Sequence, residues 1–162
     1  MKRLLMALAV AGLLVAIAAP VTSAGSARIY VTSTAGPSQP LDMGTWTVTG
    51  NVQHVRGFVM LESGIWDSIY AAGPELNTIN WDYNMATGTG AIWGSGVHTV
   101  TAIPGATWNC TFHMTFLGNP DSYAGKGVCQ GAGPLFGWQW RVDLTAAPGG
   151  STGTGYLFAP GS

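Results

Sequence analysis

The stretch Gly125-Lys-Gly-Val-Cys-Gln-Gly-Ala-Gly-Pro-Leu-Phe-Gly-Trp-Gln-Trp140 decides the fold class of this chain. It contains Cys129, one of only two cysteines, and a Gly-x-Gly pattern followed by apolar residues. The same pattern recurs as Gly88-Thr-Gly-Ala-Ile-Trp and as Gly153-Thr-Gly-Tyr-Leu-Phe. Glycine inside a strand marks a bend or a close approach of neighbouring backbone. We therefore expect these positions to let strands bend and coil at the corners of a β-barrel.

The two cysteines are predicted to form a disulfide across a hairpin. Cys110 lies in the alternating segment 107–116, and a dense turn signal follows at Leu117-Gly-Asn-Pro-Asp-Ser122. Folding the chain about this turn places Cys110 opposite Cys129, so the turn and the disulfide indicate the same antiparallel register. The alternative is a pair of metal-binding cysteines, but the sequence offers no further ligands nearby. We therefore expect no metal site.

Alternation with a period of two marks strands along the rest of the chain. The clearest apolar stripes run over Ile79, Trp81, Tyr83 and Met85, and over Phe136, Trp138, Trp140, Val142 and Leu144. Further strands are predicted over 28–33, 45–49, 52–61, 89–94, 97–103 and 153–158, with a Pro/Gly loop over 35–40. Residues 65–72 fit either helical turns or a short strand. The pattern predicts an all-β domain, an antiparallel barrel of about 8–10 short strands that is closed or nearly closed, with a β-sandwich as the alternative.

The N-terminus has the layout of a secretory signal peptide. Lys2 and Arg3 precede an apolar run over 4–19, and small residues follow. Cleavage after Ala24, or alternatively after Ala27, would leave a single secreted or extracytoplasmic domain over 25–162. An uncleaved N-terminal anchor is the alternative. No second apolar run of this length follows, so we expect no stable membrane span after cleavage.

Charge is scarce in this chain, at 8% of residues against about 25% in typical domains. Without Lys2 and Arg3, four basic residues remain against seven acidic ones, a net charge near −3. Because nucleic-acid binding requires several cations to neutralise phosphates, this composition argues against a nucleic-acid partner. A surface whose solubility comes from neutral polar residues is common among extracellular β-proteins.

Candidate catalytic residues are few and scattered. Glu62 and Asp67 bracket Ser63-Gly-Ile-Trp66, and Tyr70 follows shortly afterwards. If this segment folds over the mouth of a barrel, these side chains would be the polar groups of an apolar pocket. His54 is a fourth candidate, although it shares a mixed face with Arg56. Each of them also fits an ordinary surface role.

Seven tryptophans form the other notable feature. Tryptophan stripes at strand spacing usually belong to a core. If instead they line an unfilled lumen, the natural ligand is an apolar or flat molecule, and if they lie exposed in a row they suit sugar stacking. The candidate ligand-binding residues are Trp66, Trp81, Trp138 and Trp140.

The segment Lys126-Gly-Val-Cys-Gln-Gly-Ala-Gly-Pro-Leu-Phe-Gly, preceded by Trp108 and Phe112 and followed by the Gly153-Thr-Gly strand, resembles one group of proteins. These are small secreted bacterial β-barrel proteins of the allene oxide cyclase and dirigent-like type, and the resemblance covers about 79–158. It implies an eight-stranded barrel around an apolar cavity, which in some members steers cyclisation or coupling reactions. No catalytic residue of that group matches a position in this chain.

These observations favour a secreted β-barrel that binds a small apolar or aromatic ligand without a cofactor, or that serves as a structural extracellular module. Two alternatives are a cofactor-free cyclase or isomerase acting in the lumen and a carbohydrate-binding module that uses exposed tryptophans. The apolar stripes contain almost no ionisable groups, and a catalytic lumen requires some. This scarcity counts against an enzyme.

Overall fold

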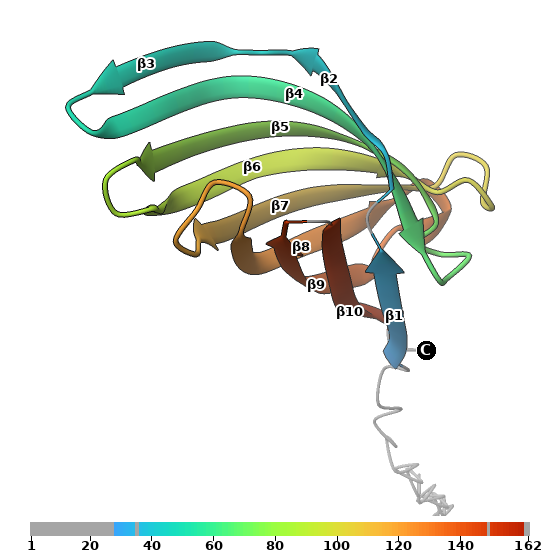
Figure 1. Cartoon of the computed structure of the whole chain (residues 1–162). Helices are drawn as coiled ribbons and strands as arrows, with labels where there is room; N and C mark the ends of the chain where they lie inside the picture. The colour runs from blue at the N-terminus through green and yellow to red at the C-terminus, as the bar shows by residue number, and fades with distance from the viewer. Residues whose placement is uncertain (1–27, 35, 149, 161–162) are drawn as a thin grey trace, which may run out of the picture.

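The computed structural model describes residues 28–34, 36–148 and 150–160, so the predicted signal peptide lies outside the described residues. The described chain is all-β, and its strands are all antiparallel, as predicted (Figure 1). The strands are β1 (Arg28–Thr34), β2 (Ser38–Asp42), β3 (Thr45–Thr49), β4 (Val52–Trp66), β5 (Gly73–Asn84), β6 (Thr89–Thr99), β7 (Thr107–Phe116), β8 (Tyr123–Ala132), β9 (Gln139–Ala147) and β10 (Gly150–Phe158). A single 3-10 turn, η1 (Gly133–Leu135), precedes β9. In the described part of the chain, no helix has the length and apolar character needed to cross a membrane.

All ten strands belong to one strongly curved sheet with the order β1-β10-β9-β8-β7-β6-β5-β4-β2, and β3 pairs with β4 beside β2. The sheet curls until β1 meets β4, but only Ser33 with Trp66 and Thr34 with Ile65 pair there. The sheet is not closed along its whole length, because β2 and β3 diverge from β10 beyond this contact (Figure 1), so closure of the predicted barrel is limited to the β1–β4 pairing. Since opposite parts of the sheet still face each other, the alternative of a sandwich-like fold fits. We call the β1–β4 contact the closed end and the β3 side the open end.

Several predicted elements differ from the structure in ways that shape the interior. Residues 38–40, part of the loop expected over 35–40, instead belong to β2, which pairs with β4. The ambiguous segment begins as the last residues of β4, and residues 67–72 form turns. The aromatic stripe predicted from Phe136 is wrong at its start, because β9 begins at Gln139 and the Phe136 side chain is 83% exposed.

Strand β4 bends at a bulge that the sequence pattern did not indicate. The pairing with β5 shifts between Val55 and Phe58, and Gly57 in this gap has a φ of +71°. A positive φ strains side chains other than glycine, so this position suits Gly57. The extra residue returns Phe58 and Met60 to the inner face and explains the muddled alternation of this segment.

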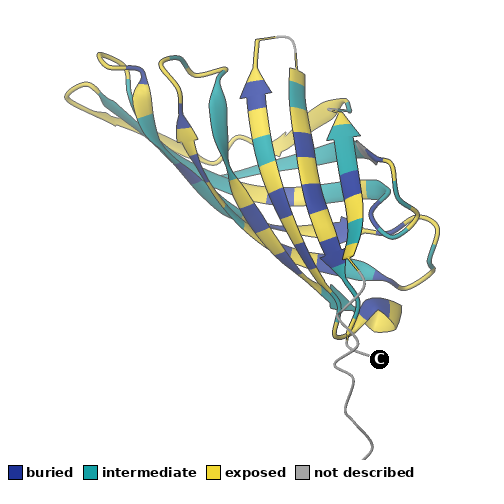
Figure 2. Cartoon of the chain, turned by 90° about the horizontal axis from the view of Figure 1, so that it is seen from below, coloured by how far each residue is buried: buried dark blue, intermediate teal, exposed yellow. Residues whose placement is uncertain are grey.

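The repeated glycines mainly make room inside the sheet, which differs from the predicted bending role. Gly127 and Gly153 are buried. A Cβ atom on Gly153 would lie 2.6 Å from Cη2 of Trp66, and one on Gly127 would lie 2.9 Å from Cγ1 of Val142. Most of the inner face of β8 is glycine, and bulky side chains on β7 and β9 fill the space beside it. Figure 2 shows the resulting alternation of buried and exposed bands along the strands.

The main hydrophobic core sits at the closed end. It gathers Trp66, Trp108, Trp140 and Leu157, together with the predicted disulfide between Cys110 and Cys129, which the structure confirms. The two cysteines are direct cross-strand partners of β7 and β8. Trp140 is the hub of this core, because its ring contacts Trp66, His98 and Trp108 edge to face. Such contacts add to the stabilisation from burial alone.

Candidate functional site

The open end of the interior contains a cavity of about 290 Å³ with aromatic walls, which we call the aromatic cavity. Trp81 is one of its walls and lies edge to face with Trp46 at 5.3 Å and with Phe58 at 5.5 Å between ring centroids. Tyr83 and Phe116 form a similar pair at 4.8 Å. The remaining lining includes Met60, Ile79, Ile92, Met114, Pro120 and Tyr123. Concave apolar spaces of this size with few polar groups are typical ligand sites.

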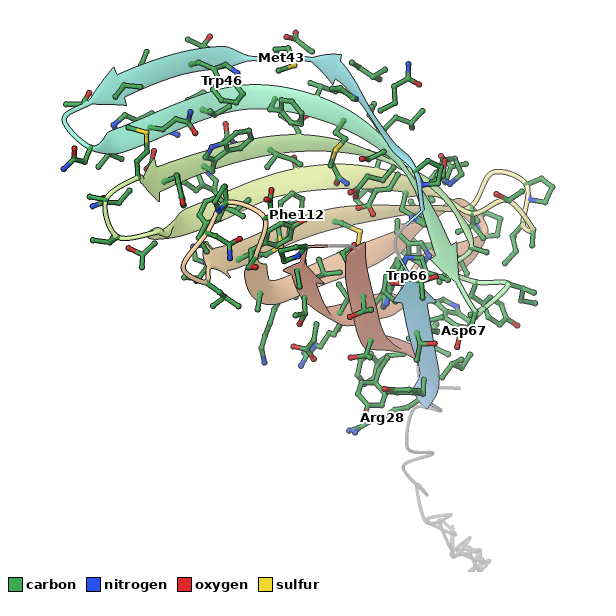
Figure 3. All side chains as sticks on the ribbon, in the orientation of Figure 1. Arg28, Met43, Trp46, Trp66, Asp67 and Phe112 are labelled. Carbon is green, nitrogen blue, oxygen red and sulfur yellow. A yellow bond between two sulfur atoms is a disulfide. The ribbon has the colours of Figure 1, made fainter. Side chains whose placement is uncertain are left out.

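A smaller cavity of about 120 Å³, the carboxylate cavity, lies next to it toward the closed end. Met60, Ile79, Met114 and Tyr123 line both cavities. The carboxylate cavity adds the polar side chains of Glu62, Glu75 and Asn77, and Trp66 lies at its far wall. Figure 3 shows Trp46 beside β3 and Trp66 near the tip of β1, on opposite sides of this interior. A ligand with an apolar body and a polar end would match the change from apolar to polar lining along the two cavities.

Two carboxyl groups face each other across paired strands in this cavity. Glu62 on β4 is the register partner of Glu75 on β5. Burial raises the pKa of Glu62 above its ordinary value, and the charge of Glu75 raises it further. A hydrogen bond of 2.9 Å from Nδ2 of Asn77 to Oε2 of Glu62 acts in the opposite direction. A carboxyl group in a cavity whose pKa is shifted by burial and by a charged neighbour is a candidate functional group.

Tyr123 responds to the same carboxyl group. Its pKa is raised, first by burial and second by the charge of Glu62. The phenol consequently keeps its proton over the physiological range and can donate a hydrogen bond to a ligand. Because Tyr123 lines both cavities, its hydroxyl group marks the boundary between the apolar and the polar region.

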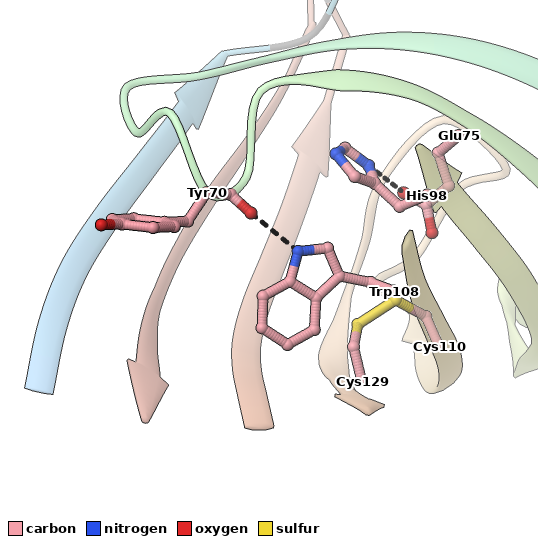
Figure 4. Close-up of a disulfide and its surroundings, with 6 residues drawn as sticks. All are labelled: Tyr70, Glu75, His98, Trp108, Cys110 and Cys129. Atoms are coloured by element: carbon pink, nitrogen blue, oxygen red, sulfur yellow. Dashed lines mark hydrogen bonds and ion pairs between the residues drawn. A yellow bond between two sulfur atoms is a disulfide. The ribbon is translucent and has the colours of Figure 1, made fainter. Parts of the chain in front are cut away.

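His98 lies behind the carboxylate cavity and is completely buried. Its Nδ1 atom is 3.8 Å from Oε2 of Glu75 (Figure 4), and its ring packs edge to face against Trp140. Neither ring nitrogen has a hydrogen-bond partner, and Oδ1 of Asn77 is also buried without one. Buried polar atoms are normally paired, and Nε1 of Trp140 in the adjacent core is unpaired as well, so these atoms mark a polar region within the interior.

Of the four predicted catalytic candidates, only Glu62 lines the interior. His54 lies outside both cavities and binds Asp82 at 2.6 Å, beside Arg56 at 2.7 Å from the same oxygen. Asp67 accepts hydrogen bonds from the backbone nitrogen and hydroxyl of Thr32, at 2.8 and 2.7 Å, and these bonds lower its pKa. Asp67 thus joins the turn after β4 to β1.

Tyr70 also has a structural role at the closed end. Its carbonyl oxygen accepts a hydrogen bond of 2.7 Å from Nε1 of the buried Trp108 (Figure 4). Its ring stacks on Trp138 with 5.1 Å between centroids. The segment that was predicted to fold over a barrel mouth therefore packs into the closed end and completes the core.

The four predicted ligand-binding tryptophans divide between the two ends. Trp81 lines the aromatic cavity and Trp66 the carboxylate cavity, whereas Trp140 fills the core and Trp138 stacks on Tyr70. Among the tryptophans, all of which lie in described residues, only Trp46 is largely exposed, at 45%. There is accordingly no exposed row of tryptophans of the kind that sugar stacking requires.

Sequence reasoning missed Glu75, Asn77, His98 and Trp46 as members of the site. Glu75 and Asn77 alternate along one face of β5 with Ile79 and Trp81, so extending that stripe toward the N-terminus would have found them. Within the described ranges, no three His, Cys, Asp or Glu side chains gather in a way that could hold a metal ion. Comparison with protein families, with curated proteins and with solved structures finds no match for this chain. The resemblance to the allene oxide cyclase and dirigent-like group thus stays a prediction.

Proposed function

We propose that this protein binds a small ligand with an apolar or aromatic body in its interior, and that it does so outside the cytoplasm. The observation that carries the proposal is the aromatic cavity of about 290 Å³, which continues into a polar end. Trp46, Trp81 and Phe58 offer flat apolar surfaces, and apolar area removed from water contributes roughly 25 cal/mol per Å². The disulfide is consistent with an oxidising, extracytoplasmic compartment.

The polar end specifies the other half of the ligand. Glu62, Glu75 and Oδ1 of Asn77 are acceptors when the carboxyl groups are ionised, and the structure pairs only one of their oxygens with a protein donor. A hydroxyl, amide or amine group on the ligand would supply the missing donors. We therefore expect an amphiphilic ligand with a donor at one end rather than a hydrocarbon.

The test is a fluorescence titration with N-phenyl-1-naphthylamine, a neutral aromatic amine whose emission rises in apolar surroundings. Ile79 lines both cavities, so Ile79→Trp fills the space and should weaken probe binding by roughly tenfold or more, a change of about 1.4 kcal/mol. Val97→Trp adds the same side chain at an exposed position and should leave binding unchanged. Equal binding by wild type and Ile79→Trp, or no binding by wild type, would overturn the proposal. Native mass spectrometry of protein purified from its source would identify a co-purified ligand.

A cofactor-free isomerase or cyclase is the second candidate, and the raised pKa of Glu62 beside Glu75 favours it. A carboxyl group whose pKa is raised by burial and by a neighbouring carboxyl group is a candidate general acid. If the co-purified molecule is chemically converted on incubation, Glu62→Gln should abolish conversion and retain binding. Unchanged molecule after prolonged incubation with the wild type would leave the binding function alone.

A further inference from the structure

The outer face of the sheet carries a second feature, an open groove of about 840 Å³ over β1, β8, β9 and β10. Arg28, Lys126 and Arg141 line this groove, and they are three of the four lysine and arginine residues in the described ranges. Asp143 is the one lining residue with a carboxyl group. On a chain whose formal net charge is −1, the groove concentrates nearly all of the described positive charge.

Two guanidinium groups in the groove flank the same aromatic ring. Arg28 is the cross-strand partner of Phe158, and its Cζ lies 5.5 Å from the centroid of that ring. Cζ of Arg141 lies 5.7 Å from the same centroid. Both guanidinium groups thus lie at one aromatic side chain, where an anion would be attracted by two positive charges. The register of β9, β10 and β1 thus builds a site for negative charge around Phe158.

Neither guanidinium is neutralised by the protein. Among the described residues, Arg28 and Arg141 form no ion pair, whereas Arg56 binds Asp82 at 2.7 Å and Lys126 lies 3.5 Å from Asp143. The guanidinium group presents its N–H donors as a fork that matches a carboxylate. The Arg28–Arg141 end of the groove is therefore the end free to take an anion.

The rest of the lining suits a sugar chain. Tyr156 is 43% exposed and packs edge to face on Tyr30, so its ring is held in place and remains accessible. Gln139 is the cross-strand partner of Phe158 and offers an amide donor and acceptor beside the ring. Fixed tyrosine rings provide flat contact area at a low entropic cost, and amides bind hydroxyl groups.

We propose that this groove binds an acidic polysaccharide, with a carboxylate bound by Arg28 and Arg141 and a sugar ring against Tyr156. A hollow suits a single chain, whereas an anionic membrane presents a plane that a protruding basic face matches better. Three cations are too few to follow the dense phosphates of nucleic acid. This site is separate from the interior cavities and does not depend on the ligand bound there.

The test is isothermal titration of the secreted domain with polygalacturonate, with the neutral glucan pullulan as the uncharged control. Wild type should bind polygalacturonate more weakly as salt is raised, because salt screens exposed charge pairs, and it should ignore pullulan. The double variant Arg28→Gln/Arg141→Gln should lose at least roughly tenfold in affinity, about 1.4 kcal/mol. Arg56→Gln removes a positive charge away from the groove and should leave binding unchanged, as should Ile79→Trp in the interior. Thermal unfolding would verify that each variant is folded.

Three results would overturn the proposal. The first is full binding of polygalacturonate by Arg28→Gln/Arg141→Gln, and the second is an equal loss in Arg56→Gln, which would indicate a nonspecific charge effect. The third is binding to phosphatidylglycerol vesicles without binding to polygalacturonate, which would assign the groove to a membrane surface. Tyr156→Ala provides an independent check, because it keeps the charge and should still weaken binding.

Discussion

The two ends of the interior are built from the same strands by the same alternation, yet one end is filled and the other is hollow. At the closed end, Trp140 is surrounded by Trp66, Trp108 and His98. At the open end, Trp81 has comparable aromatic neighbours, but a cavity of about 290 Å³ remains beside it. The difference arises from how the curved sheet closes on itself. At the closed end β1 pairs with β4 near Trp66, whereas no described strand covers the open end.

This contrast shows that an aromatic stripe on a strand does not by itself identify a core or a ligand site. What decides is how far other side chains fill the surrounding space. Trp140 packs against the segment 66–72 and the buried ring of Trp108, whereas Trp81 contacts Trp46 on the exposed strand β3 and Phe58 on β4, which are neighbouring strands of the same sheet. The same residue type therefore stabilises the fold at one end and is available to a ligand at the other.

Replacing the two tryptophans should separate these roles, with the largest effect at the closed end. Trp140→Ala leaves a cavity among packed aromatic rings, so we expect it to lower the free energy of unfolding by about 3–5 kcal/mol. Trp81→Ala should cost clearly less stability, because its site is already partly hollow, and should abolish binding of N-phenyl-1-naphthylamine. Urea unfolding of both variants checks this order. Equal destabilisation would remove the distinction between the ends.

Removing the disulfide should weaken the closed end next. Cys110 and Cys129 are separated by 19 residues, and closing a loop of about this length stabilises a protein by roughly 3 kcal/mol. We expect Cys110→Ser/Cys129→Ser to lower the urea midpoint accordingly and to leave probe binding at the open end intact once the protein is folded at low temperature. Loss of probe binding in the folded variant would show that the two ends are not independent.

A methyl group added at Gly153 should have a smaller effect on stability. Its Cβ would lie 2.6 Å from Cη2 of Trp66 and 2.7 Å from Oγ of Ser33, so the closed end would be overpacked. Overpacking of this kind typically costs about 1–3 kcal/mol. The control is a small substitution elsewhere in the sheet, Ala124→Ser on β8. A second glycine such as Gly105 would not serve, because its φ of +77° makes Gly105→Ala strained for a separate reason. A Gly153→Ala variant as stable as wild type would argue against a space-making role for the inward glycines.

The smallest effect should appear as a pH dependence from the carboxylate cavity. Because the pKa of Glu62 is raised in the folded protein, the native state binds the proton more tightly than the unfolded state. Stability should therefore fall as pH rises from the ordinary glutamate pKa through the raised value and then remain constant. Glu62→Gln should remove this loss, so the variant gains relative to wild type as pH rises.

Asp67 provides the matched comparison with the opposite sign. Its lowered pKa means that the ionised form contributes stability above the ordinary aspartate pKa, and this contribution disappears as pH falls through the folded-state value. Asp67→Asn should therefore lose stability relative to wild type at neutral pH and approach it in acid. Urea unfolding from acid to neutral pH measures both slopes, and parallel slopes for the two variants would contradict the assigned environments.

Much of the architecture was predictable from local signals. The turn at 117–122 and the alternation around Cys110 predicted the β7–β8 hairpin and its disulfide. The glycine repeats were interpreted as bends in an all-β fold, and their space-making role could not be derived from spacing, because it depends on which bulky side chains lie on neighbouring strands. Trp66 beside Gly153 is such a long-range contact.

The candidate site was less predictable, since it depends on closure and register. Glu62 was identified as a candidate because, with Asp67, it brackets a segment that could fold over a barrel mouth, but its partner Glu75 comes from a different strand. The bulge at Gly57 shifts the inner face of β4 and places Phe58, Met60 and Glu62 on the same side. No local pattern indicated that β1 would meet β4 at only two residue pairs, and this partial contact creates the open end.

The most direct test of the difference between the ends is a ¹⁹F NMR titration of protein labelled with 5-fluorotryptophan, using N-phenyl-1-naphthylamine as the ligand. Each tryptophan reports on its own surroundings, and single Trp→Phe variants assign the resonances. The resonances of Trp46 and Trp81 should shift as the probe is added, while those of Trp108 and Trp140 should stay in place. Shifts confined to Trp108 and Trp140, or equal shifts at all tryptophans, would contradict a filled closed end and a ligand-binding open end.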